Sequence, residues 1–544
     1  MKRFIVSLLT GLAAWSLTAQ EDAVLRAAMY LSGASSEEEI PADWVERLEG
    51  VSVVRINADH LMPGLLLSDY QVASIRDYRA ASGDILSWEE LSLLDGFSPE
   101  AVAALRPFLS LYSSRLPGVA DTVRVHGTAL VRTTLSSVGA KAKVMGENWR
   151  AGAAWRGRDG SFYGETRIRQ WRVIAGDFHC KWGQGLVSWT GFSMENLSTL
   201  DAFVRRSTGL SPANSYTSAS TLRGAAGEYA GRRFRASAYA AQGGRYGLHG
   251  DWLARKGQLG MSAVWDGGWN LGLDGKYNIS GADLSGELAL RKGAFGGKVS
   301  ARWKMGESWK GALQGRVLPS RFTGKKSGEY ALAMGTAFTS GRWQALSGRS
   351  GFGSSVPCHK ASLTLDAALL PIPGTASGAE PRRFQLRAYS VWQWQISPVW
   401  SVDLRLTERY RNYEFPRSDA RLDVKAASGP WQGVFRTELV HCEKWGFLTY
   451  AEGGYKADRF WSYLRLSAFS TATWNDRIYC YERDAPGTFS VPALSGTGLM
   501  GSLVGSGKFR LRRLTLRVYA RAACTIRRGN TPAPALNLQL QVEF

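Results

Sequence analysis

Regular alternation of polar and apolar side chains is the feature that most constrains this chain. From Val123 to Phe544, runs of about ten residues alternate in this way, with Gly-rich stretches between them. The closing run sets Leu536, Leu538, Leu540, Val542 and Phe544 against polar residues at the odd positions. Successive side chains of a strand point to opposite faces, so each run predicts a strand with one apolar and one polar face.

Two architectures show this period, a soluble sheet with one wet face and a transmembrane barrel. The polar faces carry Arg and Gln, as in 513–521 and 536–544, which suits a water-filled lumen. The chain stops on an aromatic residue, Phe544, which resembles the signal by which outer-membrane barrels are recognised for assembly. We therefore predict a mainly β protein, with a large antiparallel outer-membrane β-barrel of about 20 strands in 121–544. The expected partners are outer-membrane lipid and lipopolysaccharide and the barrel-assembly machinery, and the sequence specifies no oligomeric state.

The first twenty residues have the pattern of a signal peptide. Lys2 and Arg3 precede an apolar run, Phe4 to Leu17, that is too short to cross a bilayer. Beyond it no stretch of about 18 consecutive apolar residues occurs, so a membrane-embedded chain would have to cross with strands. We predict signal peptide 1–20 and export to a Gram-negative cell outer membrane.

Between the signal peptide and the barrel, residues 21–115 predict a small helical domain in the periplasm. Helical periodicity runs from Glu37 to Tyr112, and Pro117 and Gly118 then break it. Within this domain, 55–57 with 66–79, and then 82–106, look like the two halves of a tandem helix-hairpin-helix unit with its core at 52–112. This unit resembles the module of ComEA-type competence proteins, which bind DNA in the periplasm.

The resemblance implies a contact surface for nucleic acid or a protein partner. In such modules a hairpin between two helices offers backbone N–H groups to a DNA phosphate. The residues that correspond to the hairpins and the adjoining helix are Ser68, Asp69, Arg76, Arg79, Gly96, Phe97 and Ser98.

Charge favours a protein partner over DNA for this domain. Residues 37–112 hold 14 acidic side chains, 5 arginines and no lysine, a net charge of −9. Because the whole chain carries +21 and residues 1–36 carry +1, the remainder 113–544 carries +29 (21 + 9 − 1). An acidic domain is repelled by a polyanion. We expect the domain to dock on the basic barrel at its periplasmic mouth.

Two stretches of the barrel, 176–186 and 475–484, are the least generic in the chain. Together with the N-terminal module they resemble an uncharacterised outer-membrane β-barrel family with helix-hairpin-helix domains, which implies no activity. Polar residues here and in 513–521 form either a ligand site in the lumen or a structural hydrogen-bond network. These residues are Asp177, Gln184, Arg477, Tyr479, Tyr481, Glu482, Arg483, Arg513, Arg517 and Arg521.

One connection, Ser188 to Ser220, lacks alternation and is either an external loop or a segment folded into the lumen, with a short helix possible at Met194 to Arg206.

No enzymatic activity, metal or cofactor is predicted. None of the six histidines lies in a catalytic pattern. The three His–Cys neighbours would point to opposite faces of a strand, so they cannot easily share an ion. The favoured function is a channel or transport and docking barrel with a basic lumen and an acidic periplasmic cap. The alternatives are DNA binding or uptake, and a scaffold for an envelope or secretion complex. A continuous row of arginines facing the lumen would support transport. Arginine and lysine side chains on the outer surface would support contact with lipid.

Overall fold

The computed structural model describes residues 23–32, 40, 44–45, 48, 51, 53–58, 61, 64–112, 125–146, 148–191, 197, 199–216, 221–231, 233–254, 256–279, 281–306, 308–319, 321–322, 328–340, 359–370, 383–457, 459–485, 488, 490–511 and 514–544. The predicted signal peptide 1–20, the predicted boundary region 113–121 and Arg513 lie outside these residues. Within them, no helix is both long enough and apolar enough to cross a membrane.

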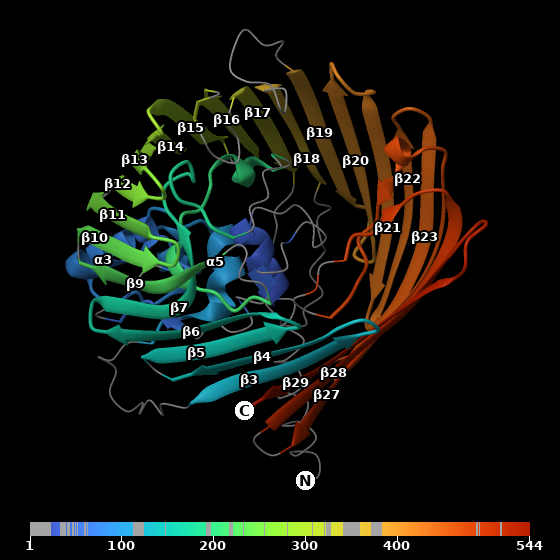
Figure 1. Ribbon diagram of the computed structural model, residues 1–544, viewed down its shortest axis with the longest axis horizontal. Helices are drawn as coiled ribbons and strands as arrows, with labels where there is room; N and C mark the ends of the chain where they lie inside the picture. The colour runs from blue at the N-terminus through green and yellow to red at the C-terminus, as the bar shows by residue number, and fades with distance from the viewer. Residues whose placement is uncertain are drawn as a thin grey trace.

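A closed antiparallel β-barrel forms most of the molecule, which confirms the predicted mainly β class and its antiparallel barrel (Figure 1). The wall runs from β3 to β7, from β9 to β24 and from β27 to β29, and β29 pairs with β3 to close it. The bounds of the wall strands are β3 His126–Thr134, β4 Val138–Met145, β5 Trp149–Arg156, β6 Asp159–Ile168, β7 Trp171–Lys181, β9 Leu222–Ala230, β10 Phe234–Ala241, β11 Arg245–Ala254, β12 Gly257–Trp265, β13 Trp269–Ile279, β14 Ala282–Arg291, β15 Ala294–Met305, β16 Trp309–Leu318, β17 Glu329–Ser340, β18 His359–Leu370, β19 Arg383–Gln395, β20 Trp400–Arg411, β21 Arg417–Ser428, β22 Trp431–His441, β23 Trp445–Lys456, β24 Phe460–Thr471, β27 Thr497–Leu511, β28 Leu514–Arg527 and β29 Ala533–Glu543.

The predicted number of about 20 strands is wrong, because the described part of the wall has 24. Some turns carry no glycine or proline and were therefore hard to recognise in the sequence. The region 162–177 is an example, since β6 and β7 meet there at a tight turn through Arg169 and Gln170. Arg169 adopts a positive φ of 54°, a conformation that Gly or Asn more commonly supplies.

The two ends of the barrel differ. At one end, here called the near end, β3 begins and β29 finishes, and most connections between strands are short turns. The backbone of Phe544 exchanges two hydrogen bonds with Gly127 there, at 2.8 and 3.0 Å. At the opposite, far end, longer connections join β7 to β9 and β24 to β27. Successive wall strands run alternately from the near end to the far end and back. The position of a residue in its strand therefore gives its distance from either end of the barrel.

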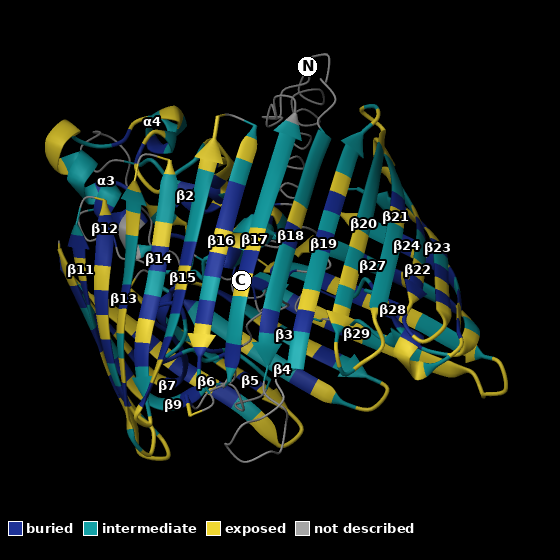
Figure 2. Cartoon of the chain, turned by 90° about the horizontal axis from the view of Figure 1, so that it is seen from above, coloured by how far each residue is buried: buried dark blue, intermediate teal, exposed yellow. Residues whose placement is uncertain are grey.

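Burial alternates along the strands, as the sequence pattern predicts (Figure 2). In β28, Arg517, Tyr519 and Arg521 are buried and face the lumen, whereas Val518 and Ala520 are exposed on the outer surface. Some lumenal glycines make room for an aromatic ring on the neighbouring strand. A Cβ on Gly454 would lie 2.0 Å from the Tyr463 ring, its direct cross-strand partner.

The N-terminal part folds as a small helical unit with its own core. Its elements are a helical stretch at 23–32, β1 (Val54–Arg55), α3 (Asp69–Ser82), α4 (Trp88–Ser92), α5 (Pro99–Leu105), the 3₁₀ helix η2 (Arg106–Phe108) and β2 (Leu109–Ser110), which pairs with β1. Ser68, Ser87 and Ser98 cap the three α-helices by accepting hydrogen bonds from backbone N–H groups. The apolar core extends from Val24 to Leu109, so the stretch 23–32 belongs to the same unit.

Candidate functional site in the barrel lumen

Ion pairs of one kind recur on the lumenal wall. Four buried carboxylates each lie between two guanidinium groups. They are Glu165 with Arg150 (2.6 Å) and Arg167 (3.1 Å), Glu228 with Arg172 (2.8 Å) and Arg235 (2.6 Å), Asp423 with Arg421 (2.7 Å) and Arg436 (3.0 Å), and Glu452 with Arg465 (2.6 Å) and Arg483 (2.7 Å). Each group of two arginines and one carboxylate carries a net charge of +1. One group has the opposite composition, because Arg316 lies between Glu329 and Asp366.

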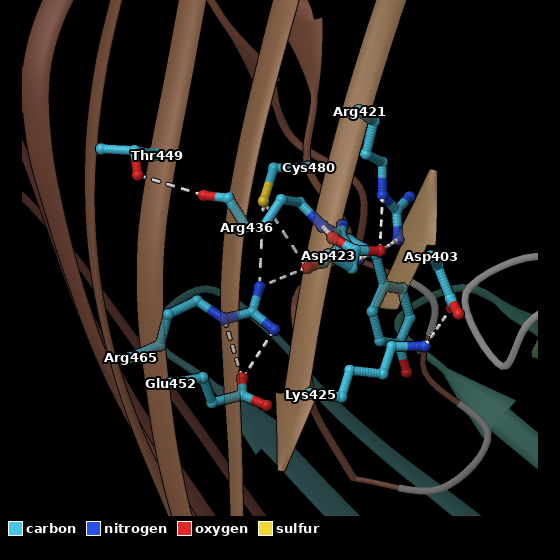
Figure 3. Close-up of polar contacts among 10 residues, drawn as sticks. Asp403, Arg421, Asp423, Lys425, Arg436, Thr449, Glu452, Arg465 and Cys480 are labelled. Atoms are coloured by element: carbon cyan, nitrogen blue, oxygen red, sulfur yellow. Dashed lines mark hydrogen bonds and ion pairs between the residues drawn. The ribbon is translucent and has the colours of Figure 1, made fainter. Parts of the chain in front are cut away.

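Two of these groups lie close together on β20 to β24 (Figure 3). Figure 3 shows Asp423 between Arg421 and Arg436, and Arg465 reaching Glu452 on the neighbouring strand. The ring of Tyr450 lies between the guanidinium groups of Arg436 (5.0 Å) and Arg465 (4.2 Å). A guanidinium over an aromatic face is stabilised by the ring quadrupole, so the ring lets two cations approach each other.

A first lumen segment, described at residues 182–191, 197 and 199–216, folds from the far end into the barrel (Figure 1). It contains the 3₁₀ helix η3 (Leu200–Phe203) and β8 (Gly209–Pro212), which pairs with the end of β7. The lumenal side chains of Ser300 and Gln314 both donate to the carbonyl oxygen of Phe203. The connection that lacked alternation in the sequence is therefore a lumenal segment, and its helix is confined to one 3₁₀ turn among the described residues.

Glu287 of β14 is the main anchor of this segment. Its buried carboxylate accepts hydrogen bonds from three backbone N–H groups, those of Gln184 (2.6 Å), Leu186 (3.0 Å) and Val187 (3.0 Å). The turn needs Gly183 and Gly185, which have φ values of 56° and 87°. The result is a nest of N–H groups closed around a carboxylate of the wall.

A second lumen segment, residues 472–496, folds inward between β24 and β27. It contains η4 (Trp474–Asp476), β25 (Ile478–Tyr479) and β26 (Ala493–Leu494). Asp476 accepts hydrogen bonds from the Thr473 hydroxyl (2.7 Å) and from the backbone N–H groups of Glu443 (3.0 Å) and Lys444 (2.9 Å). Burial raises the pKa of Asp476, but these hydrogen bonds outweigh burial and hold the pKa below its usual range.

The helical unit docks at the near end, against the wall and against the first lumen segment. Arg206 of that segment donates to the carbonyl oxygen of Leu66 in the loop before α3 (2.6 Å). Arg76 of α3 donates to the carbonyl oxygen of Gly231 in the turn between β9 and β10 (2.5 Å). Glu100 of α5 pairs with Lys310 of β16 (3.4 Å). Side views place α3 and α4 beyond the strand ends on this side of the barrel (Figure 2).

Most contact residues predicted in the helical unit have structural partners within the chain. Ser68 and Ser98 cap helices, Arg79 binds Asp84 and the carbonyl oxygen of Ala58, and the carbonyl oxygen of Gly96 accepts from Gln71. Phe97 packs partly buried on the core, and Asp69 begins α3, although its side chain is outside the described part of the chain. The loop before α3, which was predicted as the first hairpin, contacts Arg206 of the first lumen segment through Leu66.

The residues predicted as one lumen network fall into separate groups. Those near β7 are Asp177, which pairs with Arg223 (2.9 Å), and Gln184, which bonds to the backbone of Arg205. Those in the second lumen segment are Glu482, which pairs with Arg521 of β28, Arg483, which pairs with Glu452, and Tyr481, whose carbonyl oxygen accepts from Arg465. The Arg477 side chain donates to the exposed Tyr479 and to the carbonyl oxygen of Trp474, both in its own segment, and its carbonyl oxygen accepts from Arg417 of β21 (3.0 Å). Arg517 pairs with Glu543 (2.9 Å).

Sequence reasoning missed the carboxylates that organise the lumen, above all Glu228, Glu287 and Glu452. One signal was available, since each is in phase with the polar face of an alternating run, and Glu228 and Glu452 are the lone carboxylates of their runs. Among the described residues, no three His, Cys, Asp or Glu side chains are arranged to hold a metal ion.

Comparisons with known proteins give similar barrels and no family. No protein-family model matches the chain, and no curated protein matches it. The translocation pore of the P pilus usher PapC is 10% identical, with a TM-score of 0.36 over 77% of this chain and 98% of that chain. A P pilus tip assembly intermediate of E. coli containing PapC is 10% identical, with a TM-score of 0.43 over 79% of this chain and 62% of that chain. The outer membrane protein OpdK from Pseudomonas aeruginosa is 10% identical, with a TM-score of 0.28 over 77% and 99%.

Proposed function

We propose that this chain is an outer-membrane channel with a basic lumen, capped at its periplasmic mouth by the N-terminal helical unit. The observation that carries the proposal is the difference between the outer and inner surfaces of the barrel wall. The outer surface is apolar, whereas the inner surface carries four groups of two arginines and one carboxylate. Arginines that face the lumen favour a channel, whereas arginines on the outer surface would favour contact with lipid phosphates.

The outer surface supports a place in a bilayer. Exposed aromatic side chains form two belts, one near each end of the strands. The near-end belt contains Trp149, Trp171, Phe234, Trp252, Trp309, Trp400, Trp431 and Phe460, and the far-end belt contains Trp155, Tyr246, Trp265, Trp269, Phe295, Tyr410 and Trp445. Trp400 and Tyr410 are ten residues apart on β20. That separation is about 33 Å along a strand and about 25 Å in height at a tilt of roughly 40°, which matches the apolar band of outer-membrane barrels.

The orientation follows from the connections. Outer-membrane barrels have short periplasmic turns and longer extracellular loops. The near end, with the short turns and the helical unit, is therefore assigned to the periplasm, and both lumen segments enter from the extracellular side. The helical unit then lies where an acidic cap meets basic side chains of the barrel, as in the pair Glu100 with Lys310.

Planar-bilayer recordings of the purified full-length chain test this function. Under a salt gradient, the proposal predicts discrete conductance steps and a reversal potential that favours anions, because the lumen has an excess of positive charge. Arg483→Gln removes one of these charges at a partly exposed position and lowers the anion preference. Arg483→Lys keeps the charge and is the matched control. No conductance, or a preference for cations, would overturn the proposal.

A second candidate function, docking of an envelope protein, is favoured by one observation. Leu86 and Leu93 on the helical unit are 70% and 85% exposed, and Asp95 is exposed beside them. Large apolar side chains at such exposure mark interaction surfaces when they lie together. A photo-crosslinking residue at position 93 in living cells tests this function, and the absence of any discrete adduct would rule it out.

A further inference from the structure

A partly open cavity lies between the first lumen segment and the wall near the far end, and its volume is about 410 Å³. Residues 184–190, Leu197, Ala202 and Arg205 of the segment form one side, and residues of β9 to β12 and β14 to β16 form most of the other. This volume is within the range of roughly 300–1,000 Å³ that is common for small-molecule sites. We call this space the far-end cavity.

The charges around the far-end cavity are unbalanced. Its lining has five cationic side chains, Arg205, Arg245, Arg291, Lys298 and Arg316, and one carboxylate, Asp266. Asp266 pairs with Arg245 at 3.1 Å, and Arg316 lies between Glu329 and Asp366, so both of these cations have carboxylate partners and Arg291 differs from them. Arg291 donates only to the carbonyl oxygens of Leu186 (2.9 Å) and Val187 (3.2 Å), and no described carboxylate lies within 4.0 Å of it. A cation removed from water without a counter-ion is costly, and a bound anion would offset this cost.

Two hydrogen-bond donors on the same lining have no acceptor. The Nε atom of Arg291 and the indole Nε1 atom of Trp189 are both buried and unpaired. Buried donors are nearly always satisfied in folded proteins, so these two donors leave room for an acceptor at this cavity. A carboxylate has two oxygens and accepts such bonds more strongly than a neutral group.

The remaining lining is apolar and partly aromatic, with Trp189, Tyr239 and Phe322 around the space. Aromatic faces favour a flat or ring-shaped body over a compact inorganic ion. We propose that the far-end cavity is a binding site for a small organic acid in which one carboxylate is attached to a ring. The proposal deepens the channel function and rests on it for the route by which the ligand arrives.

Calorimetry on the full-length chain in detergent tests the site, with benzoate and glucuronate as ring carboxylates. Benzyl alcohol and glucose are their neutral counterparts, and sulfate is the inorganic control. At least one of the two carboxylates binds about ten-fold or more tightly than its neutral counterpart and than sulfate, since a charge-assisted hydrogen bond contributes that much. The carboxylate that binds better shows whether the ring is aromatic or a sugar.

Three variants locate the binding. Arg291→Gln weakens it about ten- to hundred-fold, and Trp189→Phe, which keeps a ring and loses the indole N–H, weakens it about two- to ten-fold. Arg510→Gln removes an exposed charge of β27 away from the cavity and leaves the affinity unchanged. If Arg291→Gln does not fold, Trp189→Phe still tests the site, because this variant keeps an aromatic ring in the cavity and loses only the indole N–H.

Failure of the site and failure of the channel give different results. Equal binding of neutral and anionic probes, sulfate binding as tight as benzoate, no binding at all, or binding insensitive to both cavity variants would overturn the site. Conductance without binding leaves the channel in place and removes the site. Binding without conductance leaves the site in place and removes the channel.

Discussion

Replacing Glu287 by Gln tests whether a single wall carboxylate holds the first lumen segment in the barrel. In the native chain this carboxylate accepts three backbone hydrogen bonds, at 2.6, 3.0 and 3.0 Å. A glutamine oxygen can accept two of them at the strength of neutral bonds, and its NH₂ group faces the third N–H.

The magnitude follows from these contacts. Two bonds each weaken by about 1 kcal/mol and the third, worth about 1.5–2 kcal/mol, is lost. The neutral amide regains part of this loss because it costs less to desolvate than a carboxylate. The remaining effect is about 2–3 kcal/mol on the closing of the segment, which is roughly a 30- to 150-fold increase in its open population.

Amide hydrogen exchange of residues 182–191 in the full-length chain measures this population directly, because exchange there requires local opening. The matched control is Asp283→Asn, which removes a carboxylate from the same strand at a half-exposed position that contacts Arg302. Glu287→Gln should speed exchange in 182–191 by the factor above and leave 472–496 unchanged. Exchange within about threefold of the native chain would refute the reasoning.

Three further predictions concern other parts of the molecule. Lys310→Glu loosens the helical unit by less than about 1 kcal/mol, seen as faster amide exchange in α5 at low salt only, because this ion pair is exposed. Asp476→Asn removes a pH effect: the lowered pKa of Asp476 stabilises the second lumen segment fully above the ordinary range near 3.9, and this stability is lost as the pH falls through the lowered value. Exchange in 472–496, corrected for intrinsic rate, should therefore rise at acid pH in the native chain and be insensitive to pH in the variant. Gly454→Ala costs about 1–3 kcal/mol in urea unfolding because its Cβ would meet the Tyr463 ring, whereas Gly453→Ala, with open space around its Cβ, serves as the control.

The barrel could be predicted from the sequence because period-two alternation is a local property of the chain. The residues 513–521 show this, since the lumenal face assigned to Arg517 and Arg521 from the pattern is the buried face in the structure. The number of strands could not be predicted as well, because a turn such as Arg169–Gln170 carries no glycine or proline.

The lumenal contacts could not be predicted, for a different physical reason. Each lumenal contact depends on which strands and lumen segments lie side by side in the closed barrel. Contacts between residues far apart in the sequence determine that arrangement. Glu287 binds N–H groups about a hundred residues earlier in the chain. Asp177 and Glu482, grouped together by their polarity, belong to different regions of the wall. Local patterns assign a face to a side chain, and only the three-dimensional register assigns its partner.

The closing pair of strands, β29 and β3, has a consequence for how the molecule assembles. It pairs residues 128–134 with residues 537–543, so the ring closes only when β29 has been added to the sheet. Bringing together ends separated by about 400 residues costs on the order of 5 kcal/mol in chain entropy, and the ladder of this one seam must offset it. Until then the growing sheet has two unpaired edges, which are templates for pairing with another chain. The interval before closure is thus the stage at which this protein is most exposed to misassembly, and the pairing of β29 with β3 ends it.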